Sequence, residues 1–190
     1  MELLKSAGIL FDSIAPELDE SLRDELPPAD RVLALSSDKA KAVASILSST
    51  APRLVLGADT LVCVTDGDGI ELALGKPNNV AEARKMLCLL SGRGHVVRTG
   101  IAVLDRDSGK TTTARSDSIV RFARMSDDDI EAYLASGEWI GVAGGYRIQG
   151  LAACFVENLE GSWTGVVGLP MRELYVILHD ALIRVHSFSI

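Results

Sequence analysis

The chain has 190 residues, which is enough for one domain or for one domain with a small lobe. With 47% hydrophobic residues it can bury a sizeable core, and its net charge of −7 argues against a nucleic-acid polymer or an anionic membrane surface as the main partner, while leaving room for a small anionic substrate. No apolar run reaches the roughly 18 residues that span a bilayer, and the N-terminus lacks the pattern of a secretory signal, so we predict a cytoplasmic protein with no membrane partner.

The first part of the chain predicts a helix, a strand and an acidic loop. Residues 2–7 have the pattern of a short amphipathic helix, and residues 9–14 have that of a short strand, which the following proline ends. The acids of residues 17–20 then fall in a loop that runs to Pro27 and Pro28. Clustered acids on a loop are usually solvated surface, although acids that follow a strand can also bind a hard cation.

The next helix and strand carry two residues of chemical interest. Residues 30–47 have helical period and include Lys39, and a lysine on a helix needs no special explanation. Residues 54–64 predict a buried strand, rich in Val and Leu, that one carboxylate, Asp59, interrupts. An ionised carboxylate in such a run is costly unless it is paired, hydrogen-bonded or bound to a cation. Structural carboxylates that backbone N–H groups satisfy are common, so the strand alone leaves both a structural and a functional interpretation open.

A turn-rich segment and a capped helix follow. Residues 66–69 predict a turn that lacks the ligand spacing of a calcium loop. The chain returns through residues 70–74 to Gly75-Lys76-Pro77, in which a lone Gly-Lys is only a weak phosphate-binding signal. Residues 79–90 predict a helix opened by an asparagine with a glutamate three positions later, a variant of the capping box.

The second half of the chain mixes strands and helices without strict alternation, which favours an α/β or α+β layer architecture with a mixed sheet. Its predicted elements are strands at 95–104 and 112–122, a capped helix over 126–137, a glycine-rich segment at 141–150, a strand at 151–156 and a last helix over 171–185. His95 is a single histidine near a strand start, so we expect a structural role for it. The three cysteines lie far apart in apolar contexts, which predicts reduced core residues.

Short motifs run along essentially the whole chain in a fixed order. They are Asp19-Glu20-Ser21, Asp38-Lys39-Ala40, Gly57-Ala58-Asp59-Thr60, Gly75-Lys76-Pro77, the segment 90–95, Ser136-Gly137-Glu138, the segment 143–150 and the segment 166–170. This ordered set resembles the Maf family of nucleoside triphosphate pyrophosphatases. The resemblance implies a single domain over residues 1–190 with an α/β fold, in which helices flank an elongated mixed sheet and two lobes enclose a cleft, as in inosine triphosphate pyrophosphatases.

The resemblance also implies an activity and a set of site residues. The activity is hydrolysis of a nucleoside triphosphate to the monophosphate and pyrophosphate with a divalent cation, Mg²⁺ or Mn²⁺. Asp59 matches the general base that accepts a proton from water, and Glu20 matches a carboxylate that shares the metal with it. The residues that match substrate-binding positions are Lys39, Lys76, Thr60 and Gln149. The segments around Thr60 and Gln149 resemble the branch that acts on dTTP and UTP, and a homodimer is compatible with this resemblance.

Two hypotheses about function follow from the resemblance. The first is an active pyrophosphatase that removes non-standard nucleotides, which the retained carboxylates and lysines favour. The second is a catalytically impaired nucleotide-binding protein with a regulatory role in cell division or septation. Met1 matches the position directly after the family's Ser-x-Ser-Pro-Arg-Arg loop, so we expect this sequence to lack that phosphate-gripping loop and to be weakly active.

Overall fold

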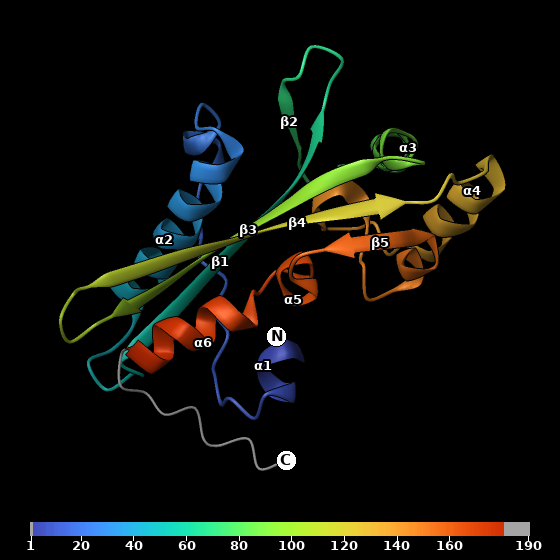
Figure 1. Ribbon diagram of the computed structural model, residues 1–190. Coiled ribbons are helices and arrows are strands. Elements are labelled where there is room, and N and C mark those ends of the chain that lie inside the picture. The colour runs from blue at the N-terminus through green and yellow to red at the C-terminus, as the bar shows by residue number, and fades with distance from the viewer. Residues whose placement is uncertain (1, 181–190) are drawn as a thin grey trace. The chain divides into compact units, whose positions relative to one another are not determined.

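The computed structural model describes residues 2–180, without the side chains of Glu20 and Leu22. The described residues form a five-stranded sheet with the strand order β2-β1-β3-β4-β5, and helices pack against it (Figure 1). The strands are β1 (Leu54–Thr65), β2 (Glu71–Leu74), β3 (Gly94–Asp105), β4 (Thr111–Phe122) and β5 (Val156–Glu160). The α-helices are α1 (Glu2–Ser6), α2 (Pro28–Ile46), α3 (Val80–Leu90), α4 (Asp127–Ser136), α5 (Trp163–Val167) and α6 (Met171–Asp180). Short 3₁₀ helices are η1 (Glu20–Arg23), η2 (Ala143–Gly145) and η3 (Leu151–Phe155).

The predicted α/β class, with a sheet flanked by helices, is confirmed. Strand β2 pairs antiparallel with β1, and β5 pairs antiparallel with β4. Strands β3 and β4 are neighbours joined by a tight hairpin, in which the Asp105 N–H donates to the Lys110 carbonyl at 2.9 Å. Connections this short join antiparallel strands, whereas parallel strands need a crossover of a dozen or more residues.

Both predicted helix caps are confirmed. Asn79 caps α3 by accepting from the Glu82 N–H at 2.9 Å. Ser126 and Asp129 form a capping box at the start of α4, which ends at Gly137 in the left-handed conformation. The predicted continuation of the last helix to residue 185 lies outside the described residues.

Two predicted strands are wrong, and each error has a local cause. Residues 9–14 form no strand: Ile9 and Phe11 pack on the core while Leu10 between them is 98% exposed. This alternation imitates a strand without a ladder of hydrogen bonds. Residues 151–155 form η3 instead, because the Glu138 side chain accepts from the first N–H of this segment and favours a helical turn. The strand β5 begins one residue later.

The cysteines also differ from the prediction. All three are free thiols, but only Cys63 is buried, whereas Cys88 and Cys154 are exposed. Burial raises the pKa of the Cys63 thiol to about 12. Cys88 lies on α3, which buries only Ala83, Leu87 and Leu90 although most of its residues are apolar, so Cys88 falls outside the buried face.

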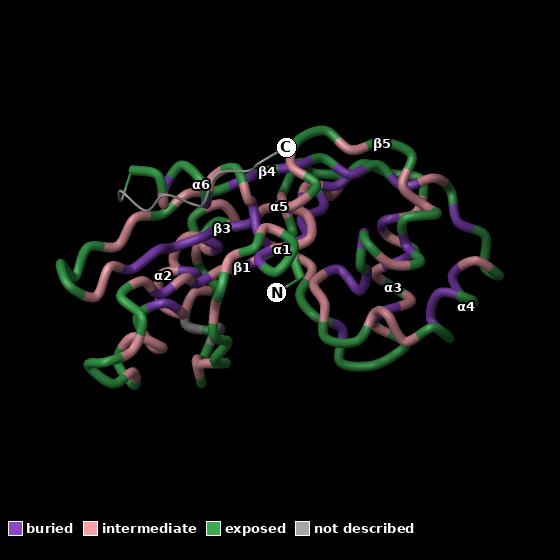
Figure 2. The backbone as a smooth tube through the Cα atoms, turned by 90° about the horizontal axis from the view of Figure 1, so that it is seen from below, coloured by how far each residue is buried: buried purple, intermediate pink, exposed green. Residues whose placement is uncertain are grey.

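The described residues divide into two compact units. The first contains residues 2–59, 99–116 and 168–180, and the second contains residues 60–98 and 117–167. Figure 2 shows how closely the buried positions follow β3, which contributes to both units.

The first unit is layered. On β1, the side chains of Leu54, Leu56 and Ala58 pack with α1 and α6, while Val55 packs with α2. Figure 1 shows α2 and α6 on opposite sides of the strands. Because successive side chains on a strand point to opposite faces, Gly57 and Asp59 share the α2 face with Val55.

The second unit has its own core. The apolar faces of α3 and α4 pack there with residues of β1, β3 and β4 and with the glycine-rich segment 141–150. The largest fully buried side chain of this core is Tyr133 on α4. This core therefore supports the segment that carries Gln149.

Candidate active site

Lys39 and Asp59 meet in the first unit. The Lys39 ammonium lies 2.6 Å from Asp59 Oδ1. The Asp59 side chain is 7% exposed and the Lys39 side chain is 20% exposed. The cost of placing a carboxylate in a buried strand is therefore offset by a charge-assisted hydrogen bond from an ammonium.

Two glycines bring α2 close enough to make this pair. A Cβ on Gly57 would overlap the Ser36 carbonyl oxygen and lie 2.9 Å from the Ala40 nitrogen. On the neighbouring strand β3, a Cβ on Gly100 would overlap the backbone of α2 in the same way, at the carbonyl of Val32. The helix backbone thus rests directly on two strands, with Lys39 one turn beyond the first contact and Asp59 two residues beyond Gly57.

Ion pairs attach the acidic segment to the same helix. Arg23 of η1 bonds Asp38 at 2.8 Å, and Arg31 of α2 bonds Asp24 at 2.5 Å. Asp19 caps η1 by accepting from the Ser21 N–H. The backbone of Glu20 is therefore held beside α2, but its side chain lies outside what the structure describes, so its role as a metal ligand stays a prediction.

Lys76 and Gln149, two of the predicted substrate-binding residues, belong to the second unit, and both are exposed. The Gly75 carbonyl, next to Lys76, accepts from the Gly144 N–H at 3.0 Å. The glycine-rich segment that carries Gln149 thus also contacts the residue next to Lys76. Thr60 follows Asp59 directly on β1, and strand alternation directs these two side chains to opposite faces.

His95 lies in the core of the second unit. It is 2% exposed, its Nε2 lies 2.8 Å from the Tyr146 hydroxyl, and the rings of Phe122 and Tyr146 meet it edge-on. Burial lowers the pKa of His95 to about 4. A neutral, enclosed imidazole of this kind stabilises the core, as expected for a structural histidine.

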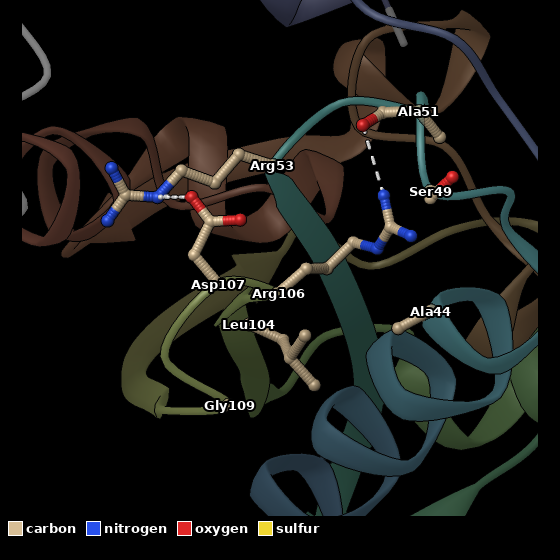
Figure 3. Close-up of a pocket in the computed structure, with 8 residues that line it drawn as sticks. All are labelled: Ala44, Ser49, Ala51, Arg53, Leu104, Arg106, Asp107 and Gly109. Carbon is tan, nitrogen blue, oxygen red and sulfur yellow. Dashed lines mark hydrogen bonds and ion pairs between the residues drawn. The ribbon is translucent and has the colours of Figure 1, made fainter.

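A separate pocket of about 480 Å³ lies in the first unit and contains none of the predicted site residues. Figure 3 shows the Arg106 guanidinium directed at the Ala51 carbonyl and Arg53 directed at Asp107. Arg106 also donates to the carbonyls after the end of α2, and Arg53 pairs with Asp105, holding the pKa of that carboxyl well below its usual range. The Arg106 contacts join the end of β3 to the end of α2, and Arg53 is paired with two carboxylates, so these side chains have a structural role in the pocket.

Sequence reasoning missed the role of Glu138. This residue was visible in the Ser136-Gly137-Glu138 motif, but no spacing rule connects it to Leu151, whose N–H donates to its Oε2 at 2.9 Å. Among the residues with described side chains, no group of three or more histidines, cysteines or carboxylates could hold a metal ion. No helix in the described ranges is both long and apolar enough to cross a membrane.

The fold defines an α/β protein whose first unit holds a buried carboxylate–ammonium pair and whose second unit holds a glycine-rich segment. The family described as Maf-like protein matches residues 1–181, and the chain belongs to this family.

Similar proteins share most of their length with this chain. A dTTP/UTP pyrophosphatase of Treponema denticola is 41% identical over 188 residues, which are 97% of this chain and 93% of that protein. One of Moorella thermoacetica is 44% identical over 177 residues, 93% of this chain and 87% of that protein. One of Syntrophus aciditrophicus is 40% identical over 179 residues, 94% of this chain and 83% of that protein.

Proposed function

We propose that this chain is a nucleoside triphosphate pyrophosphatase that hydrolyses a (d)NTP to the (d)NMP and pyrophosphate. The observation that carries the proposal is the Lys39–Asp59 pair, held at 2.6 Å where a helix backbone rests on two strands. The proposal covers residues 1–190 as a single pyrophosphatase domain. The presence of a carboxylate that can accept a proton, Asp59, next to a cation that can hold a phosphate, Lys39, favours catalysis over the alternative of an impaired nucleotide-binding protein.

Asp59 acts as the proton acceptor in this proposal. A water oxygen forms a bond to the α-phosphorus, the bond from that phosphorus to the bridging oxygen breaks, pyrophosphate leaves, and the water proton goes to the carboxylate of Asp59. Its low exposure, 7% of the side chain, limits the number of waters that can reach it. An ammonium has three donors, so Lys39 can bind Asp59 and a phosphate oxygen together.

A divalent cation fits this site if it arrives with the substrate. Mg²⁺ is usually held by one or two carboxylates together with substrate phosphates, so a single described carboxylate, Asp59, is a sufficient anchor, with Glu20 as the second ligand. When bound, Mg²⁺ or Mn²⁺ supplies neutralisation of the phosphate charge and polarises the attacking water.

The names of the similar proteins support dTTP and UTP as the substrates of this chain. Lys76 binds phosphate oxygens in this proposal, because it is exposed beside Gly75, which leaves room for a ligand to approach the backbone. Gln149 is exposed on its glycine-rich segment and its amide can both donate to and accept from a pyrimidine edge. Thr60 is the other residue proposed for base selection.

Pyrophosphate release from a panel of nucleotides tests this function. We expect turnover of dTTP and UTP above that of purine nucleotides and of 7-methyl-GTP, with added Mg²⁺ or Mn²⁺ required. Glu20→Gln should raise the metal concentration needed for half-maximal rate, because one ligand charge is lost. A purine preference would refute the substrate assignment, and an unchanged rate in excess chelator would refute the role of the metal.

A further inference from the structure

The two ends of the glycine-rich segment are tied together by one carboxylate. Glu138 follows Gly137, the left-handed residue that ends α4. Its Oε2 accepts the backbone N–H of Leu151 at 2.9 Å. The residues between them form a closed loop, and Gln149 lies at its end, two positions before the tied N–H.

Gly150 is shaped to admit this carboxylate. A Cβ at this position would overlap Glu138 Oε2 and lie 2.7 Å from Cδ. The φ of Gly150 is −106°, which any residue adopts, so the glycine is explained by the close approach of Glu138 and not by backbone conformation. The carboxylate therefore packs against the residue that follows Gln149.

The residues before Gln149 are held as well. The Arg147 guanidinium donates to the carbonyls of Glu138 and Ile140 at 3.2 and 3.3 Å, and its backbone N–H donates to the Tyr133 hydroxyl at 3.2 Å. Tyr133 is fully buried on α4. The backbone on both sides of Gln149 is thus anchored to α4 and its end, while Gln149 itself is exposed.

We propose that Glu138 is a positioning residue for base selection: by clamping the chain at Gly150 and Leu151, it holds the Gln149 amide in the orientation that reads the nucleotide base. This inference rests on the proposed function, in which Gln149 contacts the base. Glu138 does not touch substrate itself, so it affects affinity and base preference more than the chemical step.

Removal and rescue of the carboxylate test the clamp. Glu138→Ala is expected to raise KM for dTTP about tenfold, the effect of losing one hydrogen bond to a charged group, with kcat within about twofold of the parent and a weaker preference for pyrimidines. Glu138→Gln should restore the parental KM, because its amide oxygen still accepts from the Leu151 N–H. Glu157→Ala, which removes an exposed carboxylate in the same unit, is the matched control and should leave both constants unchanged.

Gly150→Ala provides a second variant that keeps the carboxylate. Its methyl group displaces Glu138 from the Leu151 N–H, so alone it should also raise KM about tenfold. In the Glu138→Ala background it should add little, because the group it displaces is gone. Melting temperatures identify any variant that is unfolded, and amide exchange at Leu151 reports loss of the clamp directly.

Affinity for a dTTP analogue with an imido group between the α- and β-phosphates separates this inference from the proposed function. A tenfold higher Kd in Glu138→Ala and Gly150→Ala, with parental Kd in Glu138→Gln, supports the clamp whether or not the parent releases pyrophosphate. Failure of the parent to release pyrophosphate refutes the proposed hydrolysis alone. Unchanged Kd in folded Glu138→Ala, with faster exchange at Leu151, overturns the inference.

Discussion

Each unit holds a buried polar pair at short distance. In the first unit Lys39 lies 2.6 Å from Asp59, and in the second His95 lies 2.8 Å from Tyr146. Asp59 and His95 are both buried residues, on neighbouring strands of the sheet. Burial and hydrogen bonding therefore do not distinguish the two pairs.

Charge and surroundings distinguish the two pairs. Lys39 and Asp59 are ionisable groups of opposite charge, and 20% of the Lys39 side chain remains exposed. His95 is enclosed by the rings of Phe122 and Tyr146, and burial lowers its pKa to about 4, which keeps it neutral. A buried polar pair thus suggests chemistry when it keeps its charges and some access, and suggests packing when it is neutral and enclosed.

The largest expected effect on stability follows from breaking the charged pair. Lys39→Met leaves the Asp59 carboxylate buried without the ammonium that lies 2.6 Å away, and removing one partner of a buried pair costs about 3–5 kcal/mol. The free energy of unfolding in urea measures this loss. Lys41→Met, which removes an exposed lysine from the same helix, is the control and should change stability by less than about 0.5 kcal/mol. Equal effects of the two substitutions would contradict the account of the pair.

The neutral pair should make the free energy of unfolding depend on pH. The folded pKa of His95, about 4, lies below the ordinary value of 6.5, so the unfolded chain binds a proton first as pH falls. His95 therefore contributes stability that is fully present above pH 6.5 and is lost as pH falls toward 4, to a total of about 3 kcal/mol. Unfolding free energies between pH 4 and 7 for the parent and for His95→Phe measure the difference. His179→Gln removes an exposed histidine and should leave the slope of the parent unchanged, and an equal slope in His95→Phe would refute the prediction.

The crossing of α2 over β1 gives a smaller effect. Gly57→Ala forces a methyl group against the backbone of Ser36 and Ala40, which cannot move without shifting the helix, and overpacking of this kind costs about 1–3 kcal/mol. Because the shift also moves Lys39 relative to Asp59, kcat should fall with stability. Gly67→Ala, at a turn where a Cβ meets nothing within 4 Å, is the matched control. Thermal melts that fail to separate the two variants would show that the close approach is not required.

The sequence predicted Asp59 and Lys39 as site residues, but it did not predict that they contact each other. Asp59 stands out because a carboxylate in an apolar strand needs a partner, and the period of residues 30–47 places Lys39 on a helix. Nothing in either pattern determines which helix crosses the strand or at which turn. Gly57 and Gly100 indicate where the helix crosses the strands. A glycine inside a strand often marks a site of close backbone approach, and the α2 backbone lies against both.

The wrong strand predictions at residues 9–14 and 151–155 have the same cause as the unpredicted contact between Lys39 and Asp59. Both segments have strand-like composition, but whether they join the sheet depends on neighbours distant in sequence: the core beneath Ile9 and Phe11, and the Glu138 carboxylate at Leu151. Local propensity yields to such tertiary contacts. The caps of α3 and α4 were predictable because both partners lie within three residues of each other.

The central claim is that the charged pair performs the chemistry while the neutral pair supports the fold. The most direct test measures kcat for pyrophosphate release in Asp59→Asn and His95→Phe under the same conditions, with each value corrected for the folded fraction. Asparagine keeps the shape of aspartate but cannot accept the water proton, and losing a general base typically costs about 10²–10⁴-fold. We predict a loss of this size for folded Asp59→Asn and a kcat within about threefold of the parent for folded His95→Phe, which loses no catalytic group and none of the charge-assisted contacts of the site. An Asp59→Asn variant that retains more than about half of the parental rate, or a folded His95→Phe variant with the larger loss, would contradict the account.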